Sequence, residues 1–283
     1  MEGSILQYDF VLKGVLAALF ASITAALAGT YIVSRRMVFL SGGIAHASFG
    51  GIGIGYFAGI SPVLGAGIFS VISALGIEYL SVRQKIREDS AIGILWAFGM
   101  ATGIIFIYLT PGYTPNLMSY LFGSILTVSW ADIIALCIMS VILIVYFAAF
   151  YRTILYMSYD EQYARTYSPY VSLFRYITTA LIALTIVLNI RMAGVVLVIS
   201  LLTIPPNTAM LFTKVFRNII WLSVLIGFAG TSSGYAISYY AGIPVGATII
   251  FTLVIIWILA KLVVRLDSVM KNGNNKVKIS NKN

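Results

Sequence analysis

Long apolar stretches alternate with short polar or turn-forming segments along this chain, from about residue 10 to about residue 266. A helix needs roughly 20 apolar residues to cross the hydrocarbon core of a bilayer. The stretches of that kind predict about nine transmembrane helices, at residues 10–33, 38–58, 61–80, 91–110, 130–150, 172–189, 194–212, 219–240 and 245–266. We therefore predict an all-α, polytopic helical membrane protein in which residues 1–266 form a single transmembrane domain.

The charges between these stretches predict how the chain is oriented. One alternating set of loops is rich in basic residues such as Arg35, Arg83 and Arg152, whereas Arg191 is the only basic residue in the other set. The positive-inside rule then places the N-terminus outside and the C-terminus in the cytoplasm, which an odd number of spans allows. Residues 267–283 form a basic tail that we expect to be cytoplasmic and disordered.

Composition supports the membrane assignment. The chain is 60% hydrophobic and 10% charged, against about 25% charged in soluble domains. The net charge of +9 could attract nucleic acid, but the basic residues lie in short loops beside the spans and in the tail, where they act as topology signals, so we expect no nucleic-acid partner. Cys137 is the single cysteine, which excludes an internal disulfide and a cysteine-cluster metal site.

The first apolar stretch is expected to remain in the protein. Residues 1–10 carry Glu2 and Asp9 and no basic residue. Because a cleaved secretory signal begins with a positively charged region, this stretch is better interpreted as a retained span.

Two connecting segments are longer than simple hairpins. In the outer loop 110–129, Leu117–Val128 is too short to span and is expected to lie at or just inside the membrane surface. The second segment, 152–171, lies on the inner side. It is long enough to hold structure of its own.

A short helix is predicted at residues 159–167 of that inner segment. Asp160 and Glu161 begin it and Arg165 follows, an order that suits the helix dipole, and Pro169 would stop or bend it. A mixed-charge helix of this kind is usually a solvated connector. Its functional interpretation is a docking site for a soluble partner.

His46, the only histidine, lies within the apolar and glycine-rich stretch 37–56. An ionisable group at membrane depth is costly and by default marks a pathway or a site, and imidazole is the commonest side-chain ligand for divalent first-row metals. A neutral imidazole hydrogen-bonded across a helix contact is the alternative, and both interpretations stay open. No Asp or Glu falls in the middle of a predicted span, and Glu78 lies near the inner end of one, where it could reach the surface.

Glycine motifs in two of the spans point to packing rather than chemistry. Gly51, Gly55 and Gly59 recur at intervals of four, which permits close helix contact in a membrane. The segment Gly230–Gly234 matches the G-x-S-x-G pattern of a nucleophile elbow around Ser232, but an elbow needs a strand-to-helix turn. An intramembrane serine hydrolase is therefore much the weaker hypothesis.

Two consecutive prolines, Pro205 and Pro206, are expected to interrupt a helix because proline removes a donor and clashes with the preceding turn. Thr203 and Thr208 could satisfy a simple kink. Alternatively, a broken helix could form a pathway wall that offers carbonyls and the Asn207 amide. The sequence leaves both open.

The chain contains no G-x-x-x-x-G-K-[ST] motif. It therefore does not bind ATP through a P-loop. If transport is energised, an ion gradient or a separate ATPase subunit must supply the energy.

Several segments, taken in order, resemble the permease subunit of the metal-type ABC importers, the zinc, manganese and iron uptake family known as ABC-3. These are residues 36–47, 89–94, 120–126, 160–165 and 194–205, which resemble the second-span motif, the opening of the fourth span, the outer short helix, the coupling segment and the seventh-span motif. They extend over most of the chain.

The resemblance implies a homodimer of permeases in a prokaryotic cell (inner) membrane, with the pathway at the dimer interface. It also implies two cytoplasmic ABC ATPases docked on the coupling segment, around Asp160, Glu161 and Arg165, and an extracytoplasmic metal-binding protein that delivers substrate. No cofactor is then held permanently. A divalent metal ion is the substrate, ATP is bound only by the partner subunit, and membrane lipids surround the spans.

One departure from the family bears on the metal. Many members carry Asp four residues before the histidine, where this chain has Gly42. A site would then consist of His46 and its dimer mate, with neutral oxygens from groups such as Ser41, Asn207 or backbone carbonyls. Nitrogen ligation weakly favours zinc or iron over manganese.

The sequence therefore predicts a permease that moves a divalent transition metal inward, with His46 as a transient ligand. The alternative within transport is an ABC permease for a metal chelate such as a siderophore or corrinoid. The alternative from another class is the serine hydrolase.

Overall fold

The computed structural model describes residues 9–111 and 128–280, and this part of the chain is built from helices. Eight of the helices are long and apolar enough to cross a membrane. The elements in chain order are α1 (Asp9–Ser34), α2 (Val38–Phe57), α3 (Pro62–Val82), α4 (Glu88–Leu109), α6 (Trp130–Ala149), α7 (Tyr151–Tyr159), α8 (Glu161–Tyr167), α9 (Val171–Phe212), α10 (Phe216–Ala241) and α11 (Val245–Ser280). The prediction of a polytopic helical membrane protein is confirmed.

Helix α9 contains two of the nine predicted spans. At 42 residues it is longer than one crossing needs, and Gly194, with φ 75° and ψ 163°, divides it into two arms. That backbone region is essentially restricted to glycine. Near the break, Arg191 pairs with Asp132 of α6 at 2.9 Å, which ties this end of α9 to a neighbouring helix. The predicted interruption between the sixth and seventh spans is therefore present.

Helix α2 packs against α3 and α4 at van der Waals contact of the backbones. A Cβ on Gly51 would overlap the carbonyl of Gly65 in α3, and a Cβ on Gly53 would overlap the backbone of Gly103 in α4. Small residues allow this approach, and dispersion contacts between close helices stabilise a membrane bundle. The packing predicted for Gly51 and Gly55 is the packing found, with Gly55 against Pro62. For Gly59 the prediction is wrong, because this residue lies past the end of α2 with φ 68° and a Cβ there would meet nothing within 4 Å.

The two prolines in the second arm of α9 do not break it. Pro205 and Pro206 are buried inside a helix that continues to Phe212, so the predicted interruption there is wrong. Proline at 206 leaves the carbonyl of Leu202 without its helical donor. That carbonyl lies against Gly29 of α1, which has no side chain to obstruct it.

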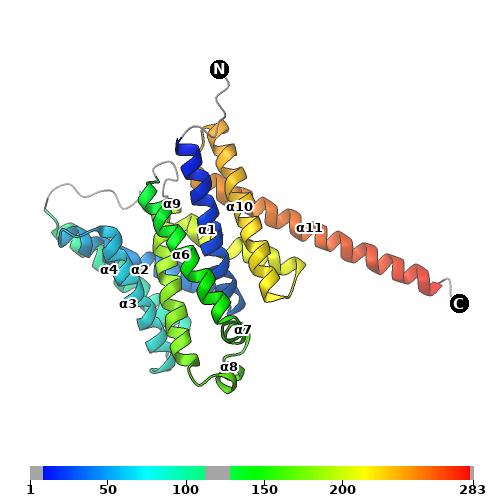
Figure 1. Ribbon diagram of the computed structural model, residues 1–283, viewed down its shortest axis with the longest axis horizontal. Coiled ribbons are helices and arrows are strands. Elements are labelled where there is room, and N and C mark those ends of the chain that lie inside the picture. Colours follow the sequence, from blue (N-terminus) through cyan, green and yellow to red (C-terminus); the bar gives the residue numbers. More distant parts are fainter. Residues whose placement is uncertain (1–8, 112–127, 281–283) are drawn as a thin grey trace.

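The predicted inner segment, outer segment and C-terminal tail can be compared with the structure in turn. Figure 1 shows α7 and α8 at the end of the bundle opposite the start of α1, so a short helix lies where one was predicted in the segment 152–171. The outer segment Leu117–Val128 lies almost wholly outside the described residues. Helix α11 continues to Ser280, past the expected span end at residue 266, and projects from the bundle. The sides on which the termini lie, and the boundary between domain and tail, stay predictions.

Replacing Gly51 by alanine should destabilise the contact between α2 and α3. The added methyl group meets backbone rather than a flexible side chain, and overpacking of this kind costs about 1–3 kcal/mol. We expect a lower unfolding temperature for the detergent-solubilised protein. The matched control is Gly93→Ala, because a Cβ there has nothing within 4 Å. Equal unfolding temperatures for the two variants would contradict the packing described.

Candidate functional site

His46 lies in α2 with its ring stacked on an aromatic side chain of α4. The imidazole and the Trp96 ring have centroids 4.5 Å apart and planes 3° apart. Phe49, one turn along α2, is 6.1 Å away at 22°. These contacts fix the plane of the imidazole. No sequence signal singled out Trp96, because a contact between two spans is set by packing rather than by spacing.

The Nδ1 atom of His46 is buried and has no hydrogen-bond partner among the described residues. The alternative interpretation of His46 required such a partner across a helix contact, and none is found at this nitrogen. Among the same residues, no group of three or more His, Cys, Asp or Glu side chains could hold a metal ion. The described part of one chain therefore offers a single imidazole, which is not a metal site by itself.

The other candidate ligands are not brought to His46. Ser41 is buried, its hydroxyl donates to the carbonyl of Val38 at 2.7 Å, and a separation of five residues turns it roughly 140° around the helix from His46. Asn207 is exposed on the second arm of α9, where its Nδ2 donates to the carbonyl of Thr203 at 2.8 Å.

Asn207 borders a hollow of about 340 Å³ that α9 forms with Val254 and Trp257 of α11. It therefore lies beside α11, whereas His46 lies beside α4. Whether either side chain serves the substrate stays a prediction.

Gly42 stands one turn before His46 on the same face of α2. A Cβ there would lie 3.7 Å from Cδ1 of Ile199 in the second arm of α9, an ordinary van der Waals distance. The absence of a side chain is therefore not demanded by packing. It leaves the His46 face without an anionic group one turn away.

The G-x-S-x-G segment forms no nucleophile elbow. Gly230, Ser232 and Gly234 all lie within the continuous helix α10, so the strand-to-helix turn that an elbow needs is missing. A Cβ on Gly230 would overlap Leu253, and one on Gly234 would lie 2.6 Å from the Cα of Ile249. These glycines serve the contact between α10 and α11, which disfavours the serine hydrolase.

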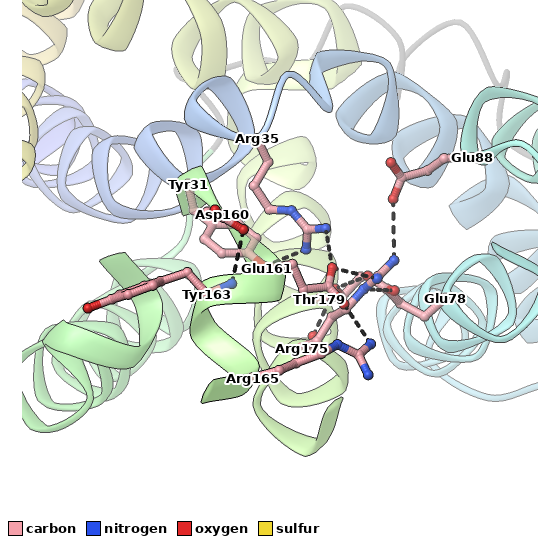
Figure 2. Close-up of polar contacts among 10 residues, drawn as sticks. All are labelled: Tyr31, Arg35, Glu78, Glu88, Asp160, Glu161, Tyr163, Arg165, Arg175 and Thr179. Carbon is pink, nitrogen blue, oxygen red and sulfur yellow. Dashed lines mark hydrogen bonds and ion pairs between the residues drawn. The ribbon is translucent and has the colours of Figure 1, made fainter. Parts of the chain in front are cut away.

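The second candidate site is a buried cluster of charges at the α8 end of the bundle (Figure 2). Arg175, at the start of α9 and 9% exposed, contacts three carboxylates from three other helices. Its Nε pairs with Glu78 of α3, its Nη1 lies 2.9 Å from Oε2 of Glu161 in α8, and its Nη2 lies 3.6 Å from Oε1 of Glu88 in α4. One guanidinium thus joins four elements.

A second guanidinium strengthens the connection. Arg35, just after α1, places its Nη2 3.2 Å from Oε2 of Glu161 and donates through Nη1 to the hydroxyl of Tyr31 at 2.9 Å. Glu78 is 1% exposed and also accepts from the Thr179 hydroxyl at 2.7 Å. The expectation that Glu78 reaches the surface is therefore wrong. Its carboxylate turns inward because Arg175 lies there to neutralise it.

Asp160, at the start of α8, and Glu161 within it are both engaged with other residues of this chain. Asp160 caps the helix by accepting from the backbone N–H of Tyr163 at 3.0 Å. Glu161 also accepts from Arg165 at 2.9 Å, in addition to its two contacts with Arg35 and Arg175.

Glu161 is held in its ionised form. Partial burial works against ionisation, but the hydrogen bond from Arg165 and the charges of Arg175 and Arg35 prevail and hold the Glu161 pKa below its usual value. The stabilisation is present above the ordinary glutamate pKa and is lost as the pH falls through the lowered one.

The sequence alone did not reveal this cluster. Glu78 and Thr179 are 101 positions apart, and Arg35 and Glu161 are 126 positions apart. The available signal was the position of Glu78, Glu88 and Arg175 at the ends of apolar stretches. Charges of opposite sign at one membrane boundary can pair, but their partners depend on how the helices pack.

Residues 7–264, nearly all of the described bundle, match ABC-3, the ABC 3 transport family. The chain belongs to the ABC-3 family. Members are permease subunits of ABC transporters and are not ATPases themselves, which agrees with the missing P-loop motif. The chain is thus a multi-pass protein of the bacterial inner membrane, as predicted.

The ABC-3 chain is similar to named transport proteins over nearly its full length. The manganese transport system membrane protein MntC of Listeria monocytogenes is 31% identical and covers 93% of both chains. A chain of PsaBC from Streptococcus pneumoniae, solved in complex with Fab, superposes with a TM-score of 0.79 at 26% identity, over 90% of this chain and 92% of that one. A provisionally assigned metal-chelate type ABC transporter in an inward-facing conformation shares the fold, with a TM-score of 0.69 at 17% identity over 92% and 91%.

Removing Arg175, the guanidinium that contacts all three carboxylates of the charge cluster, should strongly destabilise the protein. In Arg175→Ala, Glu78 would stay buried without a counter-charge, and breaking a buried pair in this way costs about 3–5 kcal/mol. We expect a large fall in the thermal unfolding temperature of the detergent-solubilised protein. Arg87→Ala is the control, because its partner Asp89 is 3.8 Å away and both side chains are mostly exposed. Arg175→Ala with a wild-type unfolding temperature would show that the cluster is not structural.

Proposed function

We propose that this chain is the permease subunit of an ATP-driven importer for a divalent transition metal, namely zinc, iron or manganese. The metal passes through the interface of a homodimer. The family membership supports the class of transporter. The observation that carries the metal is the unpartnered Nδ1 of His46, the only imidazole in the sequence, within an apolar span.

Two copies of the chain are needed to complete the pathway. His46 supplies one nitrogen, and Gly42 supplies no carboxylate beside it. Phe39, about two turns before His46 in α2, is 46% exposed at the surface of the single chain. A second copy against this surface brings a second imidazole, while backbone carbonyls or Asn207 of the second α9 arm add neutral oxygens as the helices move; Ser41 stays turned away on the same helix as His46. Weak coordination of this kind suits a pathway, because a transported ion must also be released.

The identity of the metal is set elsewhere. Nitrogen ligands favour zinc or iron weakly, whereas the Listeria relative is named for manganese. We assign the selection to an extracytoplasmic metal-binding protein that delivers the ion. The pathway then needs only to accept divalent transition metals.

Energy comes from a cytoplasmic ABC ATPase subunit, because the chain has no P-loop of its own. The segment 152–171, which contains α8, is its docking site in this proposal. ATP is bound only by that partner, and the metal is bound only in transit. Asp160, Glu161 and Arg165 belong to this docking segment.

The chelate permease is not favoured. Its support is a shared fold at 17% identity, whereas the family match covers residues 7–264. Competition between free Zn²⁺ and a metal chelate for uptake separates the two transport functions.

Substituting His46 by alanine should reduce metal uptake while the complex still assembles. Loss of even an outer partner of a metal ligand typically costs about 10–100-fold, and we expect at least this reduction in ATP-dependent uptake of Zn²⁺, Mn²⁺ or Fe²⁺ by cells or proteoliposomes.

The control is Ser48→Ala, which removes a buried hydroxyl from the same helix; among the described residues this hydroxyl donates to the carbonyl of Ala45. Unchanged uptake by the His46→Ala protein would exclude the ligand role.

A further inference from the structure

The surface of α8 that faces away from the charge cluster is aromatic. Tyr163 and Tyr167 are 54% and 49% exposed and lie one turn apart. Tyr156 of α7 supports both from beneath, with ring centroids 5.0 Å from each in edge-to-face arrangement. Figure 2 shows the Tyr163 side chain directed away from Glu161 and Arg175. We call Tyr156, Tyr163 and Tyr167 the tyrosine cluster.

A hollow adjoins this cluster. It has a volume of about 290 Å³ and lies between Tyr167 and the junction of α6 and α7, where Phe150 leaves helical geometry and Arg152 is exposed. Tyrosine and arginine are enriched at the centres of protein interfaces, because each presents a large contact area together with a hydrogen-bonding end. The pre-packed rings also lose little conformational freedom on binding.

The acidic groups of α8 are less available for a partner. Asp160 is engaged as the helix cap, and both oxygens of Glu161 already pair with arginines. An ionic dock through Glu161 would have to break contacts that join α8 to α1 and α9. The side chains of α8 that remain available to bind a partner through a large contact area are therefore the exposed tyrosines.

We propose that α8 uses its two faces for separate tasks. The tyrosine cluster and the adjoining hollow bind the cytoplasmic ATPase subunit, while Glu161 transmits the movement of α8 through Arg35 and Arg175 to the transmembrane helices. This rests on the proposed function, in that the partner is the ATPase of an importer. It adds which side chains hold that partner and which act as positioning residues.

The surroundings of the tyrosines favour a protein partner over the membrane surface. Exposed tyrosines also occur in the aromatic belts of membrane proteins. Here, however, Gln162, Arg165 and Thr166 are exposed around them on the same short helix. An aromatic centre with a polar rim is the arrangement of a protein interface.

The first test measures binding. A purified P-loop ATPase subunit of the same organism, chosen because it binds the wild-type chain in detergent, is titrated against Tyr163→Ala/Tyr167→Ala. Truncation of two aromatic anchors should weaken the affinity by about 30-fold or more, and Tyr163→Phe/Tyr167→Phe should restore most of it. The control is Tyr108→Ala, an exposed tyrosine (87%) at the far end of α4.

Affinity of the double alanine variant within threefold of the wild type would overturn the tyrosine assignment while leaving the ATPase partner intact. If no P-loop ATPase of the organism binds the wild-type chain, the proposed function fails with it. A variant that alters only the partition of the permease into lipid, with ATPase binding unchanged, would indicate an aromatic belt and would also overturn the assignment.

The second test measures coupling with Glu161→Gln, which keeps the shape of the side chain. We expect the ATPase to bind within threefold of its wild-type affinity and to hydrolyse ATP, while the metal transported per ATP hydrolysed falls at least tenfold. Arg87→Gln, in an exposed pair at the same end of the bundle, is the control. Parallel loss of binding, hydrolysis and transport would instead assign Glu161 to docking, and an unchanged transport ratio would exclude the positioning role.

Discussion

A buried guanidinium among carboxylates is the constraint on which the α8 end of this bundle depends. A charge taken out of water is tolerated only where opposite charges and hydrogen bonds replace the lost solvation. Arg175 meets that condition by drawing Glu78, Glu88 and Glu161 to one point. Since these carboxylates come from α3, α4 and α8, helix positions are determined together. Displacing one element leaves charge uncompensated in another.

The same helices lead from α8 to the imidazole. Glu88 begins α4, and Trp96 lies two turns further along it, stacked on His46 of α2. The glycine contacts between α2 and its neighbours α3 and α4 leave little room for sliding, because backbone meets backbone. A shift of α8 relayed through Arg175 to α4 is therefore expected to move the surface that carries His46. In the proposed importer, this relay lets the ATPase partner drive the pathway of a subunit that has no ATP site of its own.

The sequence predicted what depends on length and apolar composition. The apolar stretches predicted the transmembrane helices. The break in α9 at Gly194 was predicted as well, because a polar segment around Asn189 and Arg191 interrupts the apolar run there. The sequence also indicated His46, whose rarity is visible without coordinates. It failed at Pro205 and Pro206, because the carbonyl that Pro206 frees, that of Leu202, lies against Gly29, far away in sequence. It missed the charge cluster for the same reason, since the partners of Arg175 come from separate helices.

The distance between two spin labels, one on α8 and one on α4, measures directly whether α8 and the transmembrane helices move as one unit. Thr166→Cys in α8 and Ser90→Cys in α4 are both exposed, and Cys137→Ser removes the single native thiol. In the complex with its ATPase, a rigid connection through Arg175 predicts the same distance in the nucleotide-free and ATP-bound states, and a change between those states only when Glu161→Gln is added. A distance that changes equally with and without Glu161→Gln would contradict the connection.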